Sequence, residues 1–167
     1  YHQEIIDLLK DSIQTKERVL RELVPSINKA AELLVQALSE GKKLLLFGNG
    51  GSAADSQHIA AELVGKLSVK RRALPAIALT TDTSNLTALA NDFGYDTVFE
   101  RQVEALGQEG DVAIGISSTG HSSNVIAAIR EARAKGLKTI ALSGRDGGPL
   151  SQMVDVAIVI PSTSTQR

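Results

Sequence analysis

Apolar residues follow helical spacing at the start of the chain. In residues 1–40 they recur every three or four positions, with lysine and glutamate between them, which is typical of amphipathic helices. Val24-Pro25 interrupts this pattern because proline disfavours helical backbone at the residue before it. A second helix is predicted over Ser26–Glu40, and Gly41 ends it. We therefore expect a helical arm over about residues 1–40.

The pattern changes after the arm. Five short runs are apolar at successive positions, which is typical of strands buried on both faces of a parallel sheet. The predicted strands are Lys43–Phe47, Ala76–Leu79, Val112–Ile116, Thr139–Leu142 and Val156–Ile160. The intervening helices are predicted at Ser52–Val64, Asn85–Ala90, Val98–Leu106 and Ser122–Ala134, with a short helical turn near Leu150. This alternation predicts a doubly wound α/β core over residues 42–160, with a five-stranded, mostly parallel sheet flanked by helices.

Composition narrows the class of protein. The 167 residues are the length of one domain, and we expect a single domain over residues 1–167. The absence of cysteine excludes disulfides, thiolate metal sites and a cysteine nucleophile. A net charge of −1 and 3% aromatic residues argue against nucleic-acid partners. No apolar run approaches the ~20 residues of a membrane span, so we expect a soluble intracellular protein without membrane partners.

Glycines follow the first predicted strand, at Gly48-Asn49-Gly50-Gly51-Ser52. Glycine allows a ligand to approach the backbone, and a helix N-terminus favours an anion or a polar oxygen. The spacing resembles a dinucleotide fingerprint, but the first acid after the next strand, Asp82, lies more than 30 residues past Gly48. No Lys-Ser or Lys-Thr pair follows the glycines, which excludes a nucleotide P-loop. The alternative interpretation is a tight turn without ligand.

Hydroxyl side chains follow the third predicted strand. Residues 117–123 contain five of them, directly before a helix. Hydroxyls, backbone N–H groups and the helix dipole can hold a phosphate without lysine. Helix capping needs only one such side chain, so we favour a phosphate site for a small metabolite over a solvated turn.

His58 and Glu62 are four residues apart on the first helix of the core, so they share one helix face. They could be a general base with its partner, two metal ligands, or a surface pair. His121 lies in the hydroxyl loop and could contact ligand or solvent. Asn91-Asp92-Phe93-Gly94 is interpreted locally as a turn or cap after a helix, and Asp146-Gly147-Gly148-Pro149 as a turn without chemistry.

The same motifs, in the same order, resemble the phosphoheptose isomerases, bacterial proteins of the sugar isomerase (SIS) domain family. The resemblance covers nearly the whole chain and includes Leu142–Gly148. It implies conversion of sedoheptulose 7-phosphate to D-glycero-D-manno-heptose 7-phosphate, a precursor of lipopolysaccharide heptose. It also implies a cytoplasmic homotetramer, a zinc ion and no nucleotide cofactor.

Individual residues take roles by the same resemblance. Glu62 matches the acid/base carboxylate, and His58 with Glu62 matches two zinc ligands. The implied substrate contacts are Asn49, Gly50, Gly51, Ser52 and Glu62, with Asn91 and Asp92 beside the sugar, and Ser117, Ser118, Thr119 and Ser122 around the phosphate. The chemistry is coherent, since isomerisation needs an acid/base group, polar groups for a developing oxyanion and an anchor for the substrate.

The sequence departs from the family pattern in places. His121 stands where these isomerases commonly have Asn, and Thr119 where they commonly have Ser. The family continues beyond Arg167 into a helix with a Gln and a His, toward which residues 165–167 lead. Two alternatives stay open: an SIS-domain protein that binds the DNA replication initiator without catalysis, and a sugar-phosphate sensor. Glu62 and the Asn91–Gly94 motif favour the enzyme.

Overall fold

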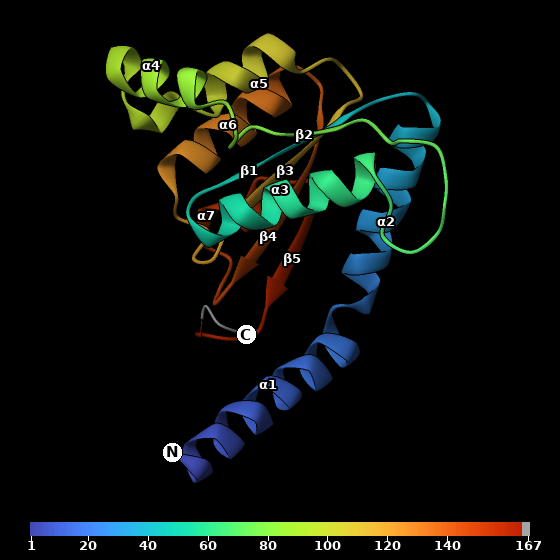
Figure 1. Cartoon of the computed structure of the whole chain (residues 1–167), viewed down its shortest axis with the longest axis vertical. Coiled ribbons are helices and arrows are strands. Elements are labelled where there is room, and N and C mark those ends of the chain that lie inside the picture. Colours follow the sequence, from blue (N-terminus) through green and yellow to red (C-terminus); the bar gives the residue numbers. More distant parts are fainter. Residues whose placement is uncertain (165–167) are drawn as a thin grey trace.

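The computed structural model describes residues 1–164. Residues 165–167, which lead toward the expected C-terminal helix, lie outside the described residues. Two long helices precede an alternation of strands and helices (Figure 1). The elements are α1 (His2–Glu22), α2 (Val24–Ser39), β1 (Leu44–Gly48), α3 (Gly51–Val64), β2 (Ala76–Ala78), α4 (Thr83–Phe93), the 3₁₀ turn η1 (Tyr95–Thr97), α5 (Glu100–Leu106), β3 (Val112–Ser117), α6 (Ser123–Ala134), β4 (Lys138–Gly144), α7 (Gly148–Gln152) and β5 (Val156–Ile160).

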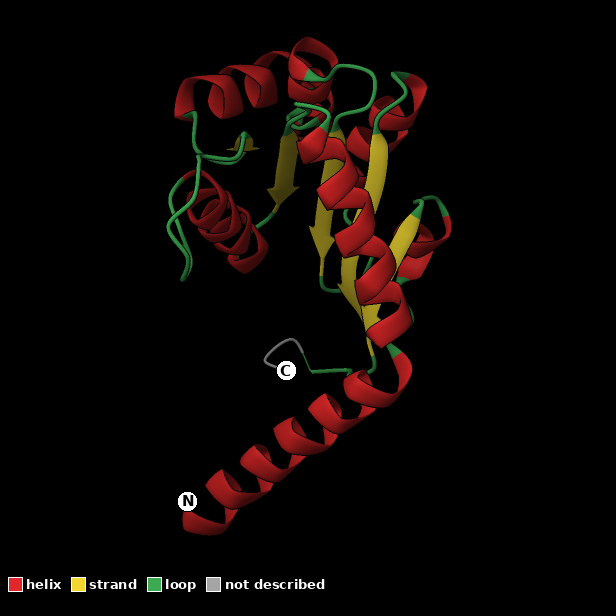
Figure 2. Cartoon of the chain, turned by 90° about the vertical axis from the view of Figure 1, so that its right-hand side faces the viewer, coloured by secondary structure: helices red, strands yellow, loops and turns green. Residues whose placement is uncertain are grey.

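The predicted helical arm is confirmed. Leu23 separates α1 from α2, and Pro25 lies in the first turn of α2, where a missing N–H costs no helical hydrogen bond. Helix α1 extends away from the α/β body (Figures 1 and 2). Its apolar residues Ile5, Leu9 and Ile13 are more than half exposed. Among the described residues, no helix is long and apolar enough to span a membrane.

The sheet has five strands in the order β2-β1-β3-β4-β5. Every pairing is parallel, so the expectation of a mostly parallel sheet becomes an entirely parallel one. Leu46 of β1 lies in register with Ala78 of β2 on one side and Ile114 of β3 on the other. All residues of β1 and β3 are buried, which explains why their sequences are apolar at successive positions.

Helices cover both faces of the sheet and form two cores. On one face, α2 and α3 pack over Leu44, Leu46 and Ile114. On the other, α4 to α7 pack over Leu45, Phe47 and neighbouring residues of β3 and β4. Alternate residues of each strand therefore enter different cores.

Several predicted boundaries are wrong, including the start of α2, which lies at Val24 and not at Ser26. Helix α4 begins two residues earlier than expected because the Asp82 side chain accepts a hydrogen bond from the Asn85 N–H and caps it. It also continues through Asn91 and Asp92, which were expected in a turn or cap after the helix, and Gly94 occupies the C-cap position. Strand β4 continues past Leu142 to Gly144, because β3 and β5 extend alongside it.

The strand order determines where a ligand can bind. From β1 the chain crosses to β2 on one side of the sheet, whereas β3 is followed by β4 on the other side. The connections leaving the carboxyl ends of β1 and β3 therefore diverge, and a crevice opens between them.

At the amino ends of the strands, directly before β3, Asp111 is buried and hydrogen-bonded. It accepts bonds from the ammonium and backbone N–H of Lys43 and from the backbone N–H of Gln108. Burial by itself raises the pKa of Asp111, but these hydrogen bonds outweigh it and hold the pKa below its usual value. Asp111 thus joins the beginnings of β1 and β3.

We predict that Asp111→Asn lowers the free energy of unfolding at pH 7 by about 2 kcal/mol, because a charge-assisted bond to Lys43 is lost. A depressed folded pKa stabilises the protein above the unfolded pKa of about 3.9, and this stabilisation disappears as pH falls through the lower folded value. Urea unfolding should therefore show the difference between wild type and variant shrinking below pH 4. Glu109→Gln, an exposed neighbour, is the control. An equal difference at pH 3 and pH 7 would contradict the assignment.

Candidate functional site

The crevice between β1 and β3 begins at Gly48, where the two strands approach closely. A Cβ on Gly48 would lie 2.7 Å from the Ile116 carbonyl oxygen and 2.7 Å from Ser52 Cβ. Gly50 follows with φ +57°, a left-handed conformation that suits glycine, and caps the start of α3. The glycines of this loop therefore serve strand packing and a sharp turn into the helix, which sets the backbone N–H groups of α3 at the crevice.

Asn49 is fixed by side chains from the other side of the crevice. Its amide exchanges two hydrogen bonds with the Asn124 amide, at 2.9 and 3.0 Å, and its Oδ1 also accepts a bond from the Tyr95 hydroxyl at 3.1 Å. Asn124 is buried in the first turn of α6. The sequence pattern singles out neither Asn124, which directly follows the hydroxyl stretch, nor Tyr95. No local pattern relates residues 49, 95 and 124, so only the fold could reveal this cluster.

The hydroxyl loop converges on the start of α6. Ser117 Oγ, at the end of β3, is hydrogen-bonded to Ser122 Oγ at 2.9 Å, and Ser122 occupies the N-cap position of α6. Ser118 is exposed and Thr119 is half-buried between them. His121 Nδ1 lies 2.7 Å from the Thr119 carbonyl oxygen, so the ring donates to its own loop. The structure therefore brings Ser117, Ser118, Thr119 and Ser122 together at one helix N-terminus, as the sequence predicts.

The loop after β4 supports the hydroxyl loop by direct backbone packing. A Cβ on Gly120 would lie 1.9 Å from the Gly147 carbonyl oxygen, and a Cβ on Gly148 would lie 2.7 Å from the Thr119 carbonyl oxygen. The Leu150 N–H also donates to the Gly120 carbonyl. The Asp146–Pro149 segment was expected to be a turn without chemistry. The structure shows a turn through Asp146 and Gly147 that leads into α7 at Gly148, and both glycines pack against the hydroxyl loop.

A cleft of about 500 Å³ lies beside these loops. Its polar wall includes Ser52, Asp55 and His58 of α3, with Ser118 and Ser143 from the ends of β3 and β4. Ile59, Ile116 and Leu142 supply apolar surface. The cleft thus unites the start of α3 with the hydroxyl loop, as expected for a ligand site at the carboxyl edge of a parallel sheet.

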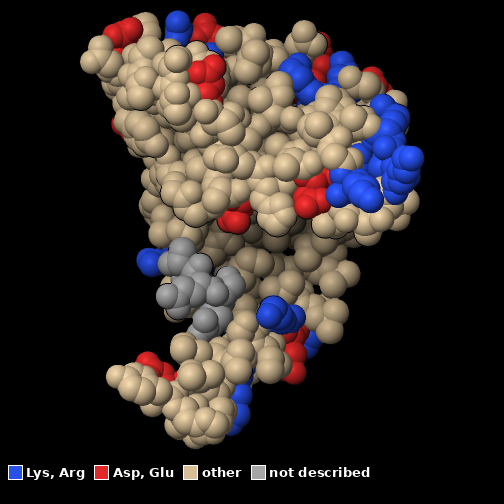
Figure 3. Space-filling model, in the orientation of Figure 1, with Lys and Arg blue, Asp and Glu red and all other residues tan. Residues whose placement is uncertain are grey.

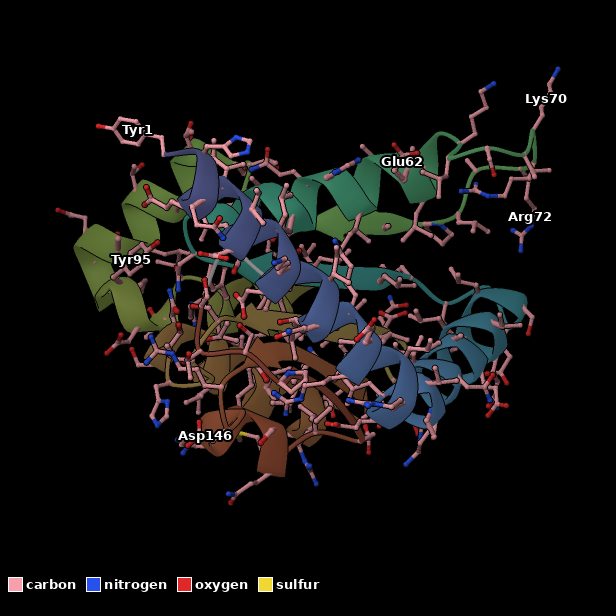
Figure 4. All side chains as sticks on the ribbon, turned by 90° about the horizontal axis from the view of Figure 1, so that it is seen from below. Tyr1, Glu62, Lys70, Arg72, Tyr95 and Asp146 are labelled. Atoms are coloured by element: carbon pink, nitrogen blue, oxygen red, sulfur yellow. The ribbon has the colours of Figure 1, made fainter. Side chains whose placement is uncertain are left out.

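Glu62 lies on α3 beyond the residues of that helix that line the cleft. It is ten residues past Ser52, about 15 Å along the helix axis at 1.5 Å per residue. Figure 4 shows Glu62 toward the end of α3 that faces Lys70 and Arg72, and Tyr95 toward the opposite end. His58 lines the cleft and His58 Nε2 lies 3.5 Å from Glu62 Oε1, so the pair shares one face of α3.

Basic residues surround the end of α3. Positive side chains gather on one side of the molecule over the segment between α3 and β2 (Figure 3), which contains Lys66, Lys70, Arg71 and Arg72. The Arg71 guanidinium donates to the carbonyl oxygens of Glu62 and Leu63, at 2.7 and 2.8 Å. Arg71 therefore caps the C-terminus of the helix that carries Glu62.

Asn91 and Asp92 lie at the exposed end of α4, where the Asn91 amide donates to the Asp92 carboxylate at 2.8 Å. They do not line the described cleft. Tyr95, three residues beyond Asp92, is the residue of this segment that reaches Asn49.

A zinc ion in a protein normally takes three or four protein ligands. His58 and Glu62 provide two donors on one helix face, but residues 1–164 contain no cluster of three or more His, Cys, Asp or Glu side chains suited to a metal. The described residues therefore do not by themselves complete a zinc site.

Comparisons with known proteins agree with this architecture. The SIS domain family model matches residues 7–144, and this family is the class that the fold and the cleft define. A phosphoheptose isomerase of Geobacter metallireducens is 54% identical over 166 residues, which cover 99% of this chain and 88% of the relative. That of Aquifex aeolicus is 51% identical over 165 residues, covering 99% and 86%.

Solved structures extend the likeness to the fold. The phosphoheptose isomerase of Neisseria gonorrhoeae superposes with a TM-score of 0.93 at 45% identity, covering 99% of this chain and 88% of that one. The one of Francisella tularensis gives 0.94 at 37%, covering 98% and 87%. The chain belongs to the SIS domain family and, within it, to the phosphoheptose isomerases.

We predict that Gly120→Ala lowers the free energy of unfolding by about 3 kcal/mol or more, because it combines a left-handed backbone with overlap against Gly147. Gly41→Ala is a matched control, since Gly41 has φ +76° but open space around its Cβ position. The control should cost about 1 kcal/mol. Urea unfolding compares the two, and equal losses would contradict the supporting role of the Gly147 loop.

Proposed function

We propose that this protein isomerises sedoheptulose 7-phosphate to D-glycero-D-manno-heptose 7-phosphate. The observation that carries the proposal is 54% identity to a phosphoheptose isomerase over 99% of the chain. The cluster of hydroxyls at the start of α6 supports it independently, because a phosphosugar needs such an anchor. The similarity to isomerases also favours the enzyme over a non-catalytic SIS-domain protein that binds the replication initiator, and over a sensor.

The phosphate is proposed to lie at the N-terminus of α6. Ser117, Ser118, Thr119 and Ser122 would donate their hydroxyls, and the helix dipole would favour the negative charge. The entropic cost of ordering these hydroxyls is reduced because the loop after β4 already packs against the loop that carries them. Binding energy from the phosphate would then hold the sugar in register for reaction.

The sugar is proposed to extend from the phosphate along α3. Asn49, Gly50, Gly51 and Ser52 would contact its hydroxyls near the crevice. His58 lines the cleft and Glu62 lies one turn beyond it, so the reactive carbons would lie toward that pair. By the resemblance to the family, Asn91 and Asp92 are also proposed to contact the sugar, from outside the described cleft.

Glu62 is proposed to carry the proton between carbons. The reaction removes a proton from C1 of the ketose and returns one to C2, through an enediol. The hydroxyl proton moves from O1 to O2, which converts the C2 carbonyl to an alcohol and C1 to an aldehyde. Atoms and electrons therefore balance without a redox partner or a nucleotide cofactor. A carboxylate suits the transfer because it can accept a proton and return it.

His58 and Glu62 are also proposed to be two ligands of a zinc ion, with the remaining ligands coming from beyond the described residues. Zinc would supply a Lewis acid that polarises the sugar oxygens. We further propose that residues 1–167 form one SIS domain that assembles as a cytoplasmic homotetramer. The exposed apolar residues Ile5, Leu9 and Ile13 of α1 support an assembly, because burying them against another copy would be favourable.

We predict that Glu62→Gln in the full-length protein reduces kcat at least 10²-fold while binding of sedoheptulose 7-phosphate persists, because the amide cannot accept the C1 proton. Glu40→Gln, at the exposed end of α2, is the control and should keep wild-type kcat. The measurement is conversion of the ketose phosphate with calorimetric titration of binding. Undiminished turnover would remove Glu62 from the mechanism.

We predict that the double change Ser117→Ala and Ser122→Ala raises KM at least tenfold with a smaller effect on kcat, because it removes two phosphate donors remote from the reacting carbons. Steady-state kinetics separates the two constants. Ser39→Ala, on the exposed end of α2, should leave both unchanged. An unchanged KM in the double variant would contradict the phosphate assignment.

We predict that full-length protein purified without chelator carries zinc and that His58→Ala loses it, since one ligand of a site with few donors is removed. Mass spectrometry of metal content is the measurement, and His121→Ala, whose ring donates to its own loop, should retain the metal. Zinc-free wild type with full activity would refute the zinc proposal and leave the isomerase proposal intact.

A further inference from the structure

Ser143 has a buried hydroxyl that nothing in the described structure satisfies. The residue is 7% exposed, at the end of β4. Among residues 1–164, Ser143 Oγ is the one buried side-chain nitrogen or oxygen without a hydrogen-bond partner. Such a group destabilises the folded state, because burial removes its hydrogen bonds to water and no protein group replaces them. An unsatisfied hydroxyl beside a ligand site therefore needs a physical explanation.

The position of Ser143 in the sheet suggests that explanation. Ser143 and Ser117 are register partners at the ends of β4 and β3. A Cβ on Gly115 would meet Val125 and Ile129 of α6, so Gly115 and, two residues on, Ser117 face that helix. Gly115 pairs with Ala141, which belongs to the same core, and Ser143 follows Ala141 by two residues. Ser117 and Ser143 are thus neighbours on one face, with strands about 4.8 Å apart.

The hydroxyl of Ser117 changes its partner requirement when an anion binds. In the ligand-free structure, Ser117 Oγ and Ser122 Oγ share one hydrogen bond of 2.9 Å in which either hydroxyl can donate, and Ser117 Oγ keeps at least one free lone pair. A phosphate at the start of α6 would accept the protons of both hydroxyls, and donation to an anion would make Ser117 Oγ a stronger acceptor than it is in the ligand-free structure. Rotation about the Cα–Cβ bond of Ser143, which is unhindered by any existing hydrogen bond, could direct its O–H at Ser117 Oγ.

We propose that Ser143 is a positioning residue for the phosphate site, donating to Ser117 Oγ when Ser117 donates to the bound phosphate. The resulting chain runs from the Ser143 O–H through the Ser117 O–H to a phosphate oxygen. Each bond polarises the next, so the terminal bond to the anion is strengthened. The inference deepens the proposed function, because it rests on the phosphate site at residues 117–122.

Opposite effects on stability and affinity distinguish this role from a structural one. Ser143→Ala removes an unsatisfied hydroxyl, so the melting temperature without ligand should rise by about 2–4 °C. The same change should weaken binding of inorganic phosphate by about five- to tenfold, because the donor that supports Ser117 is lost. A buried serine with a purely structural role would not combine a gain in stability with a loss of affinity.

Thermal unfolding of the full-length protein across a titration of inorganic phosphate measures both quantities. Thr139→Val is the control, because Thr139 is buried on the same strand but is hydrogen-bonded to Asp155 at the far end. It should lower the melting temperature and leave phosphate affinity unchanged. Wild-type phosphate affinity in Ser143→Ala, a lower melting temperature in that variant, or no stabilisation of wild type by phosphate would each overturn the inference.

The isomerase assay is separate from this titration. Protein that binds phosphate through Ser143 but does not convert sedoheptulose 7-phosphate supports the inference and refutes the proposed function. Protein that converts the sugar with phosphate binding indifferent to Ser143 does the reverse.

Discussion

The close approach of β1 and β3 at Gly48 is the constraint on which the site depends. These are the strands from which the chain turns to opposite sides of the sheet, so their carboxyl ends border the crevice. Any side chain at residue 48 would overlap Ile116 or Ser52 and push the two connections apart. The Asn49–Asn124 amide pair spans the same gap and fixes its width. A ligand in the cleft therefore meets polar groups that the backbone has already placed.

Backbone packing also determines how the hydroxyl loop behaves. The loop packs against the glycines after β4 and is also held by its own hydrogen bonds, among them the one between Ser117 and Ser122. Among the buried side-chain nitrogen and oxygen atoms of residues 1–164, Ser143 Oγ alone lacks a hydrogen-bond partner, and Ser143 is the register partner of Ser117. Proteins tolerate such a cost at functional sites, where a partner arrives with the ligand. Stability and binding are thus linked through one face of β4.

The sequence predicts much of the fold because burial on both faces leaves a continuous apolar run in β1 and β3. It also predicts the hydroxyl loop, since five hydroxyls before a helix exceed capping needs. The end of α4 was not predicted because Asn91 and Asp92 favour turns locally. In the structure, packing of α4 against the core extends the helix through both residues as far as Phe93. The contacts of Tyr95 with Asn49, and of Gly120 with Gly147, join distant segments and leave no local pattern.

The proposed reaction requires a phosphosugar to be anchored by its phosphate at the start of α6 and isomerised beside α3. The most direct measurement compares kcat/KM of the full-length protein for sedoheptulose 7-phosphate and for sedoheptulose without phosphate. We expect conversion of the phosphorylated sugar, with kcat/KM about 10³-fold lower when the phosphate is absent, because remote binding energy is lost. Equal kcat/KM for the two sugars, or no conversion of either, would contradict it.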